Sequence, residues 1–94
     1  MIELIFAELK RHGMVGSSNE FSSDWLGMEK SYLRCLRAKQ RQPSPKAIAA
    51  CATRLQRVSR TLTATNKPKA VAAGTRMAEL ADRCIDEILA AGMR

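Results

Sequence analysis

The chain has 94 residues and a mass of 10.4 kDa, which allows one small domain and excludes most enzymes. Hydrophobic residues make up 46% of it but aromatics only 4%, so the core must rely on aliphatic side chains and alanine. A net charge of +7 indicates a polyanionic partner or an acidic protein surface. Because so small a core is marginally stable alone, self-association is favoured.

The basic charge is concentrated in the middle of the chain. Residues 30–69 carry eleven Lys and Arg and no acid, whereas residues 1–29 carry two bases and five acids. Residues 70–94 are nearly neutral, with three bases and four acids. The plain interpretation of such a block is a solvated face. A bound polyanion would relieve its self-repulsion, and we favour that interpretation.

Three cysteines, Cys35, Cys51 and Cys84, form no CxxC pair, and their odd number is typical of a reducing cytoplasm. They lie in helix-forming stretches among apolar residues, so we expect structural roles, no metal site and no cofactor. No catalytic motif is present, and we do not expect an enzyme. No leader peptide and no run of eighteen apolar residues is found, which predicts a soluble, cytoplasmic protein without membrane contact.

Two short helices are predicted in the first 27 residues. Apolar residues spaced by three and four predict a helix from residue 2 to residue 12, closed by Gly13. Ser17 and Glu20 form a capping box that opens the second helix, which Gly27 ends.

The aromatic pair of the second helix, Phe21 and Trp25, lies one turn apart. We expect both side chains in the core, and a platform that stacks single-stranded bases is the disfavoured alternative.

Three further helices are predicted after Gly27. The third covers residues 29–38, with Leu33 and Leu36 pointing inward. The fourth has Ser44 as its N-cap, Pro45 in its first turn and an end near residue 61. Residues 63–69 are rich in Thr, Asn, Lys and Pro and are predicted as a linker.

The last helix, from residue 70 to about residue 91, is amphipathic and nearly neutral. It either packs on the other helices or pairs with the same helix of a second chain, and we favour pairing. The expected dimer contacts are Met77, Leu80, Cys84 and Ile88.

The centre of the chain has the layout of a helix-turn-helix, in which a second short helix enters the major groove of DNA. Gly27 suits the turn because glycine tolerates positive φ. Lys30, Ser31 and Arg34 supply hydrogen-bond donors at the start of the second helix of the motif.

The stretch LGMEKSYLRCL, residues 26–36, and the run RQPS, residues 41–44, resemble the lambda-repressor-like helix-turn-helix family of the Cro and Xre class. This resemblance implies base or phosphate contacts from Lys30, Ser31 and Arg34, and backbone contacts from the loop Lys39–Arg41. The chain departs from the family pattern before and after the turn.

The departures are at four positions. Where the family often has Ala this chain has Ser23, and the Leu expected one position earlier is Ser22, which indicates a shifted helix register. Arg37 stands where the family often has Glu, and Lys39 stands where it usually has Gly.

The sequence thus predicts an all-α bundle of about five helices that contains a helix-turn-helix. Residues 1–62 form the DNA-binding domain, residues 63–69 the linker, and residues 70–94 a dimerisation helix. The expected function is sequence-specific binding of double-stranded DNA by a small bacterial transcriptional regulator, acting as a homodimer with residues 29–38 in the major groove.

Two kinds of contact are expected with the duplex. Lys30 and Arg34 read bases, and the other side chains hold the phosphate backbone. These others are Tyr32, Arg37, Lys39, Arg41, Lys46, Arg54 and Arg57, and Ser31 contacts either a base or a phosphate. The main alternative is an antiactivator-like module whose basic face holds an acidic protein, and a third is a non-specific nucleoid or RNA-binding protein.

Overall fold

The computed structural model describes residues 1–92, and in this range every regular element is helical. The elements are α1 (Ile2–Arg11), α2 (Ser18–Glu20), η1 (Phe21–Trp25), α3 (Tyr32–Lys39), α4 (Pro45–Thr63) and α5 (Pro68–Gly92). The expected all-α bundle of about five helices is confirmed.

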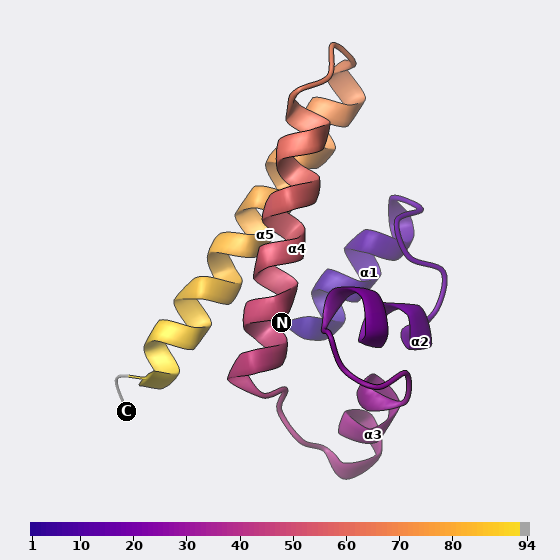
Figure 1. The fold of residues 1–94 in the computed structure, drawn as a ribbon, viewed down its shortest axis with the longest axis vertical. Coiled ribbons are helices and arrows are strands. Elements are labelled where there is room, and N and C mark those ends of the chain that lie inside the picture. The colour runs from indigo at the N-terminus through magenta and orange to yellow at the C-terminus, as the bar shows by residue number, and fades with distance from the viewer. Residues whose placement is uncertain (93–94) are drawn as a thin grey trace.

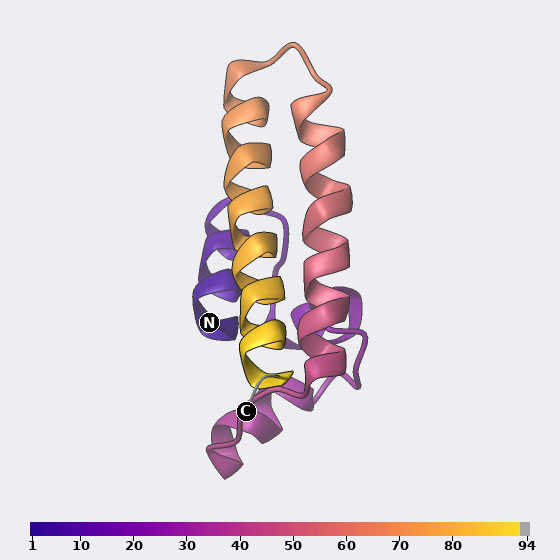
Figure 2. The same ribbon diagram turned by 90° about the vertical axis from the view of Figure 1, so that its left-hand side faces the viewer.

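Two long antiparallel helices, α4 and α5, form the spine of the molecule (Figure 1). The shorter elements α1, α2 and η1 lie on one side of this hairpin, and α3 lies at the end opposite the α4–α5 connection (Figures 1 and 2). The body measures 42 × 32 × 17 Å. The flat shape follows from this arrangement, because one face of the hairpin has no layer over it (Figure 2).

The core lies between the hairpin and the shorter helices. Its fully buried side chains include Ile5 and Leu9 of α1, Phe21, Leu55 of α4 and Leu80 of α5. The rings of Phe6 and Phe21 pack with centroids 5.2 Å apart. Trp25 is also buried, so both aromatics of the second helix lie in the core as expected.

The expected linker is a tight turn. α4 continues to Thr63 and α5 begins at Pro68, so only residues 64–67 connect them. The end of α4 packs against α5 near Gly74, and the Thr63 hydroxyl there donates to the Ser59 carbonyl of the preceding turn at 2.9 Å. α5 packs along α4 in one core, and Thr63, Pro68 and Lys69 of the expected linker 63–69 belong to these two helices.

The residues expected to pair two chains are buried in the chain's own core. Met77, Leu80 and Cys84 have no exposed surface, and Ile88 is half-buried against the same cluster. The apolar stripe was correctly located, but its partners are α4 and α1 of the same chain. Residues 93 and 94 of the predicted dimerisation segment lie outside the described residues.

The second helix carries an extra residue in its middle. α2 runs into the π-helical turn η1, where the N–H of Leu26 donates to the carbonyl of Phe21, five residues earlier, at 3.1 Å. A π turn holds one residue more than an α turn. As a result Ser22 is fully buried, whereas Ser23 is only half-buried.

Local capping chemistry fixes most helix ends as predicted. The Ser17 hydroxyl accepts from Glu20 N at 3.2 Å, and the Ser44 hydroxyl accepts from Ala47 N at 3.2 Å. Gly13 and Gly27 have φ of +73° and +64°. The capping box differs in one detail: the Glu20 carboxylate accepts from Gly16 N, one residue before the N-cap, at 3.0 Å.

The third helix begins later than expected. α3 starts at Tyr32, so Lys30 and Ser31 belong to the turn that precedes it. It ends at Lys39, and the residue in left-handed conformation is Gln40, with φ 51° and ψ 41°. The Arg41 N–H then donates to the Leu36 carbonyl at 3.0 Å, which closes a Schellman motif without glycine.

Candidate nucleic-acid interface

A buried hydrogen bond holds the two helices of the central motif together. The N–H of Leu33, in the first turn of α3, donates to the Ser22 hydroxyl at 3.1 Å. The same hydroxyl donates to the Ser18 carbonyl at 2.8 Å. Ser31, the N-cap residue of α3, makes no side-chain cap. Ser22 therefore caps α3 from the neighbouring helix, and this role was missed because no local signal distinguishes Ser22 from Ser23.

Gly27 allows the chain to turn close to α4. Its φ of +64° disfavours residues with a side chain, and a Cβ built there would lie 3.6 Å from the Cβ of Ala50. This is ordinary van der Waals contact, so the constraint at Gly27 lies in the backbone.

The outer side of α3 is uncovered. Leu33 lies in the core and Leu36 is half-buried beside a pocket next to Ile2, while Arg34, Cys35 and Ala38 are exposed on the opposite side. Ser31 lies at the start of the same side and is half-buried. The exposed side thus combines small side chains with one arginine, and it lies at one end of the molecule (Figure 1).

The segments flanking α3 add exposed positive charge. Lys30 precedes the helix, Lys39 and Arg41 lie at its end, and Lys46 lies in the first turn of α4. Between residues 30 and 46 no acidic residue occurs. The sequence-predicted residues of this group are therefore brought to one end of the molecule.

Tyr32 has a structural contact that the sequence did not suggest. Its hydroxyl accepts from the backbone N–H of Ser44 at 3.0 Å and lies 3.5 Å from the Ser44 hydroxyl. The ring therefore joins the start of α3 to the start of α4. The expected phosphate contact is not the main role that this geometry gives Tyr32.

Arg37 is held by a carboxylate of α1. Its Nε and Nη2 each donate to Glu3 at 2.7 Å, and its guanidinium lies 5.7 Å from the centre of the Phe6 ring. The hydrogen bonds from Arg37 hold the pKa of Glu3 below its usual value. This pair fastens α3 to α1 and makes Arg37 less available than its neighbours.

The arginines of α4 lie farther along the hairpin. Arg54 is exposed and lies over the buried Trp25, with its guanidinium carbon 5.4 Å from the ring centre. Arg57 follows one turn later. Both line a shallow groove of about 280 Å³ together with Val58, Thr61 and Leu62.

All eleven bases of residues 30–69 are exposed. Within residues 1–92, only Arg37 of this group makes an ion pair with a carboxylate. The basic block identified in the sequence is thus a largely unpaired surface.

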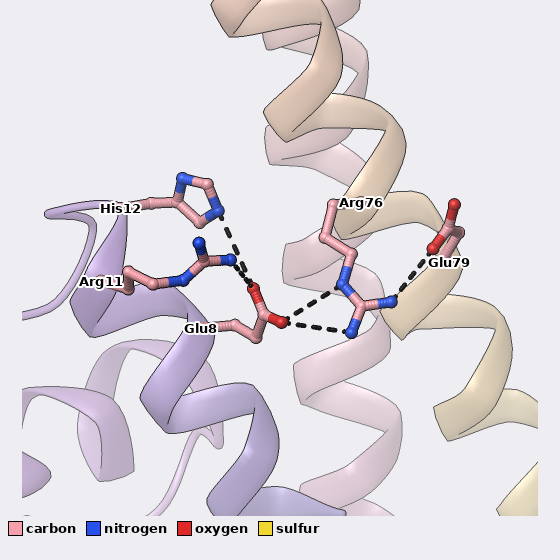
Figure 3. Close-up of polar contacts among 5 residues, drawn as sticks. All are labelled: Glu8, Arg11, His12, Arg76 and Glu79. Atoms are coloured by element: carbon pink, nitrogen blue, oxygen red, sulfur yellow. Dashed lines mark hydrogen bonds and ion pairs between the residues drawn. The ribbon is translucent and has the colours of Figure 1, made fainter.

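A separate polar cluster connects α1 to α5 (Figure 3). Glu8 accepts from Arg76 at 3.1 Å and from Arg11 at 2.7 Å, and His12 lies 3.8 Å away. Arg76 also donates to Glu79 at 3.0 Å. The hydrogen bond from Arg11, followed by that from Arg76, lowers the pKa of Glu8. This cluster holds α1 in place and thereby supports α3 through Glu3.

The cysteines divide into two kinds. Cys51 and Cys84 are fully buried, and the hydrogen bond with Cys84 together with burial raises the pKa of Cys51. Cys35 is exposed on α3, which corrects the expectation that all three lie among apolar neighbours. No group of three metal-ligating side chains is found in residues 1–92, and no helix in that range could span a bilayer.

Comparison with known proteins identifies a family. A family model described as "Family of unknown function (DUF6626)" matches residues 2–93. The chain belongs to the DUF6626 family. The match covers α1 to α5, so the hairpin and the segment from α2 to α3 both lie within the region that the DUF6626 model describes. No significant match is found among curated proteins or among solved structures.

Proposed function

We propose that the protein binds double-stranded DNA by placing α3 in the major groove. The observation that carries this proposal is the exposed side of α3. The hydrogen bond from Leu33 to Ser22 fixes the helix on its buried side, and its exposed side carries Arg34 and no acidic residue. The flanking charges from Lys30 to Lys46 are all basic. A short exposed helix with this environment suits contact with base edges between two phosphate backbones.

The π turn supports the resemblance to the Cro and Xre class. One additional residue between Phe21 and Gly27 moves the pattern by one position. Phe21 then occupies the place where the family has Leu, and Ser22 the place of its small residue. A single inserted residue in the π turn thereby accounts for both departures from the family pattern, at Ser22 and at Ser23.

The expected contacts differ in kind. Arg34 and Lys30 are proposed to read bases, with Ser31 beside them, whereas Lys39, Arg41 and Lys46 hold phosphates. Arg54 and Arg57 lie along α4 and would meet only DNA that extends beyond α3. Arg37 contributes indirectly, because its contact with Glu3 sets the position of α3.

A gel shift with genomic fragments at about 50 mM salt tests the proposal, since phosphate contacts are strong at that ionic strength. We expect retardation that withstands competition by random duplex. Absence of retardation at this salt concentration would overturn the proposal, and retardation without sequence preference would favour the non-specific nucleoid protein.

A second candidate function is capture of an acidic protein on α4. The observation that favours it is the groove between Arg54, Arg57 and the half-buried Val58 and Leu62, which joins positive charge to apolar surface. An acidic amphipathic helix has the complementary character. In this case Arg57→Glu would abolish binding of the protein partner, and Arg34→Glu would not.

A further inference from the structure

One broad face of the α4–α5 hairpin is not covered by any element of the described chain (Figure 2). At about 100° per residue, Ala49, Gln56 and Thr63 lie on the side of α4 opposite Arg54, which touches Trp25. On α5, Val71, Ala78, Ile85 and Leu89 lie opposite Arg76, which pairs with Glu8 of α1. We name this set of seven residues the hairpin face.

The residues of the hairpin face lie in one row along each helix. Ala49, Gln56 and Thr63 recur every seven residues on α4, and Val71, Ala78 and Ile85 do so on α5.

The hairpin face combines exposed and half-buried side chains. Leu89 is 60% exposed, the highest value among the large hydrophobic side chains described, and Ala49 is also exposed. Val71, Ala78 and Ile85 are half-buried. Ile85 packs against the chain's own core, so within the α5 part of the hairpin face Leu89 is the large apolar side chain exposed to solvent.

The two edges of this face carry opposite charges. Lys46 and Arg60 lie along the α4 edge, and Asp82 and Asp86 lie along the α5 edge. None of the four makes an ion pair within residues 1–92. A face with one basic and one acidic edge is complementary to a second copy of itself, provided that α4 of one copy meets α5 of the other.

We propose that the hairpin face pairs two copies of this chain, with the two-fold axis parallel to the long helices. This axis places α4 against the partner's α5 and forms an antiparallel four-helix bundle. An axis across the hairpin would instead place α4 against α4 and bring like charges together.

The positions of these charged residues along the hairpin axis follow from a contact between α4 and α5. Ser59 of α4 donates to the Gly74 carbonyl of α5 at 2.6 Å, so these residues lie at one height. Counting in opposite directions along the two helices, Lys46 lies within about one turn of the height of Asp86. A parallel two-fold axis preserves height, so Lys46 of each copy faces Asp86 of the other.

The choice of axis rests in part on the proposed function. A parallel axis puts both α3 helices at the same end of the dimer, where they can meet one duplex. The pairing itself is independent of DNA, so its test is performed without DNA. A chain that stays monomeric without DNA would contradict the pairing but not the proposal of DNA binding. Absence of retardation in the gel shift would contradict DNA binding but not the pairing.

Sedimentation equilibrium of the full chain at about 50 μM tests the pairing. We expect a mass twice that of the 10.4 kDa chain. Leu89→Glu and Ala49→Glu, on two different helices, should each raise the dimer dissociation constant about tenfold or more, because a carboxylate would be buried without a partner. The control Leu4→Glu changes an exposed leucine of α1, which lies away from this face, and should leave the dimer intact.

A charge exchange tests the orientation. Lys46→Asp and Asp86→Lys should each weaken self-association, whereas an equimolar mixture of the two variants should form a heterodimer that restores both contacts. A monomeric wild type at this concentration, or a dimer that responds to Leu4→Glu and not to the two variants of the hairpin face, would overturn the proposal. Equal self-association of the single variants and their mixture would overturn the parallel axis.

Discussion

The hydroxyl of Ser22 caps a helix that begins ten residues later in the chain, because it accepts from the N–H of Leu33 at 3.1 Å. Both atoms are buried. The position of α3 relative to η1 therefore depends on a single small polar side chain.

Ser22→Ala should lower the free energy of unfolding by about 1–2 kcal/mol, because it leaves the Leu33 N–H without a partner. Thermal unfolding measures this loss. Ser23→Ala is the matched control: its hydroxyl makes only long hydrogen bonds, of 3.4 and 3.3 Å, and the change should stay within about 0.5 kcal/mol. Equal effects of the two substitutions would contradict the role of Ser22.

Gln40→Gly should stabilise the protein by about 0.5–1 kcal/mol. Gln40 occupies the left-handed region, with φ 51°, where a side chain is disfavoured and glycine is not. Urea unfolding is the measurement, with Gln42→Gly as the control, since Gln42 has no positive φ. A stabilisation at Gln42 equal to that at Gln40 would remove the conformational explanation.

Gly74→Ala should separate the two long helices at their closest point. A Cβ there would lie 2.8 Å from Thr63 Cγ2 and 3.0 Å from the Ser59 carbonyl oxygen. We expect a loss of about 1–3 kcal/mol from overpacking, measured by thermal unfolding. Gly92→Ala, where a Cβ meets nothing within 4 Å, should be nearly neutral. If both substitutions behave alike, the helices are not in close contact at Gly74.

Acid should weaken the connection between α1 and α5. The pKa of Glu8 is lower in the folded protein than its ordinary value of 4.5, through the hydrogen bonds from Arg11 and Arg76. A lowered pKa gives a contribution that is present above the ordinary value and is lost as the pH falls through the folded value. The midpoint of thermal unfolding should therefore fall with acidification below about pH 4.5 less steeply in Glu8→Gln than in the wild type. Identical slopes would show that Glu8 contributes nothing to this dependence.

Arg34→Ala and Lys39→Ala should weaken DNA binding in different ways. Loss of Arg34 should reduce discrimination between operator and random duplex, whereas loss of Lys39 should weaken both alike and reduce the salt slope by about one unit. Lys67→Ala, in the α4–α5 connection at the other end of the molecule, is the control. An equal loss on all duplexes for Arg34→Ala would exclude base reading by that side chain.

Much of the local structure was predictable because it depends on neighbouring residues. The caps at Ser17 and Ser44, the positive φ of Gly13 and Gly27, and the extent of each helix to within a few residues follow from short-range chemistry. The clustering of charge in residues 30–69 is likewise a property of the sequence alone.

Contacts between distant residues were not predictable from these signals. The departure at Ser22 and Ser23 from the family pattern indicates a shifted register, but the π turn and the contact of Ser22 with Leu33 follow only from the fold. The position of Arg37 on α3 predicts a phosphate contact, whereas its ion pair with Glu3, 34 residues earlier, depends on the fold.

The last helix, α5, shows most clearly which features depend on the sequence alone and which depend on the tertiary structure. Its periodicity determined which side is apolar, since that depends only on the order of residues along a helix. Whether that side meets the same chain or another depends on where the other helices lie, and the fold buries Met77, Leu80 and Cys84 internally. Only the tertiary structure decided that this side is buried and that the adjacent side of the hairpin stays uncovered, because that outcome depends on where α1, η1 and α4 pack.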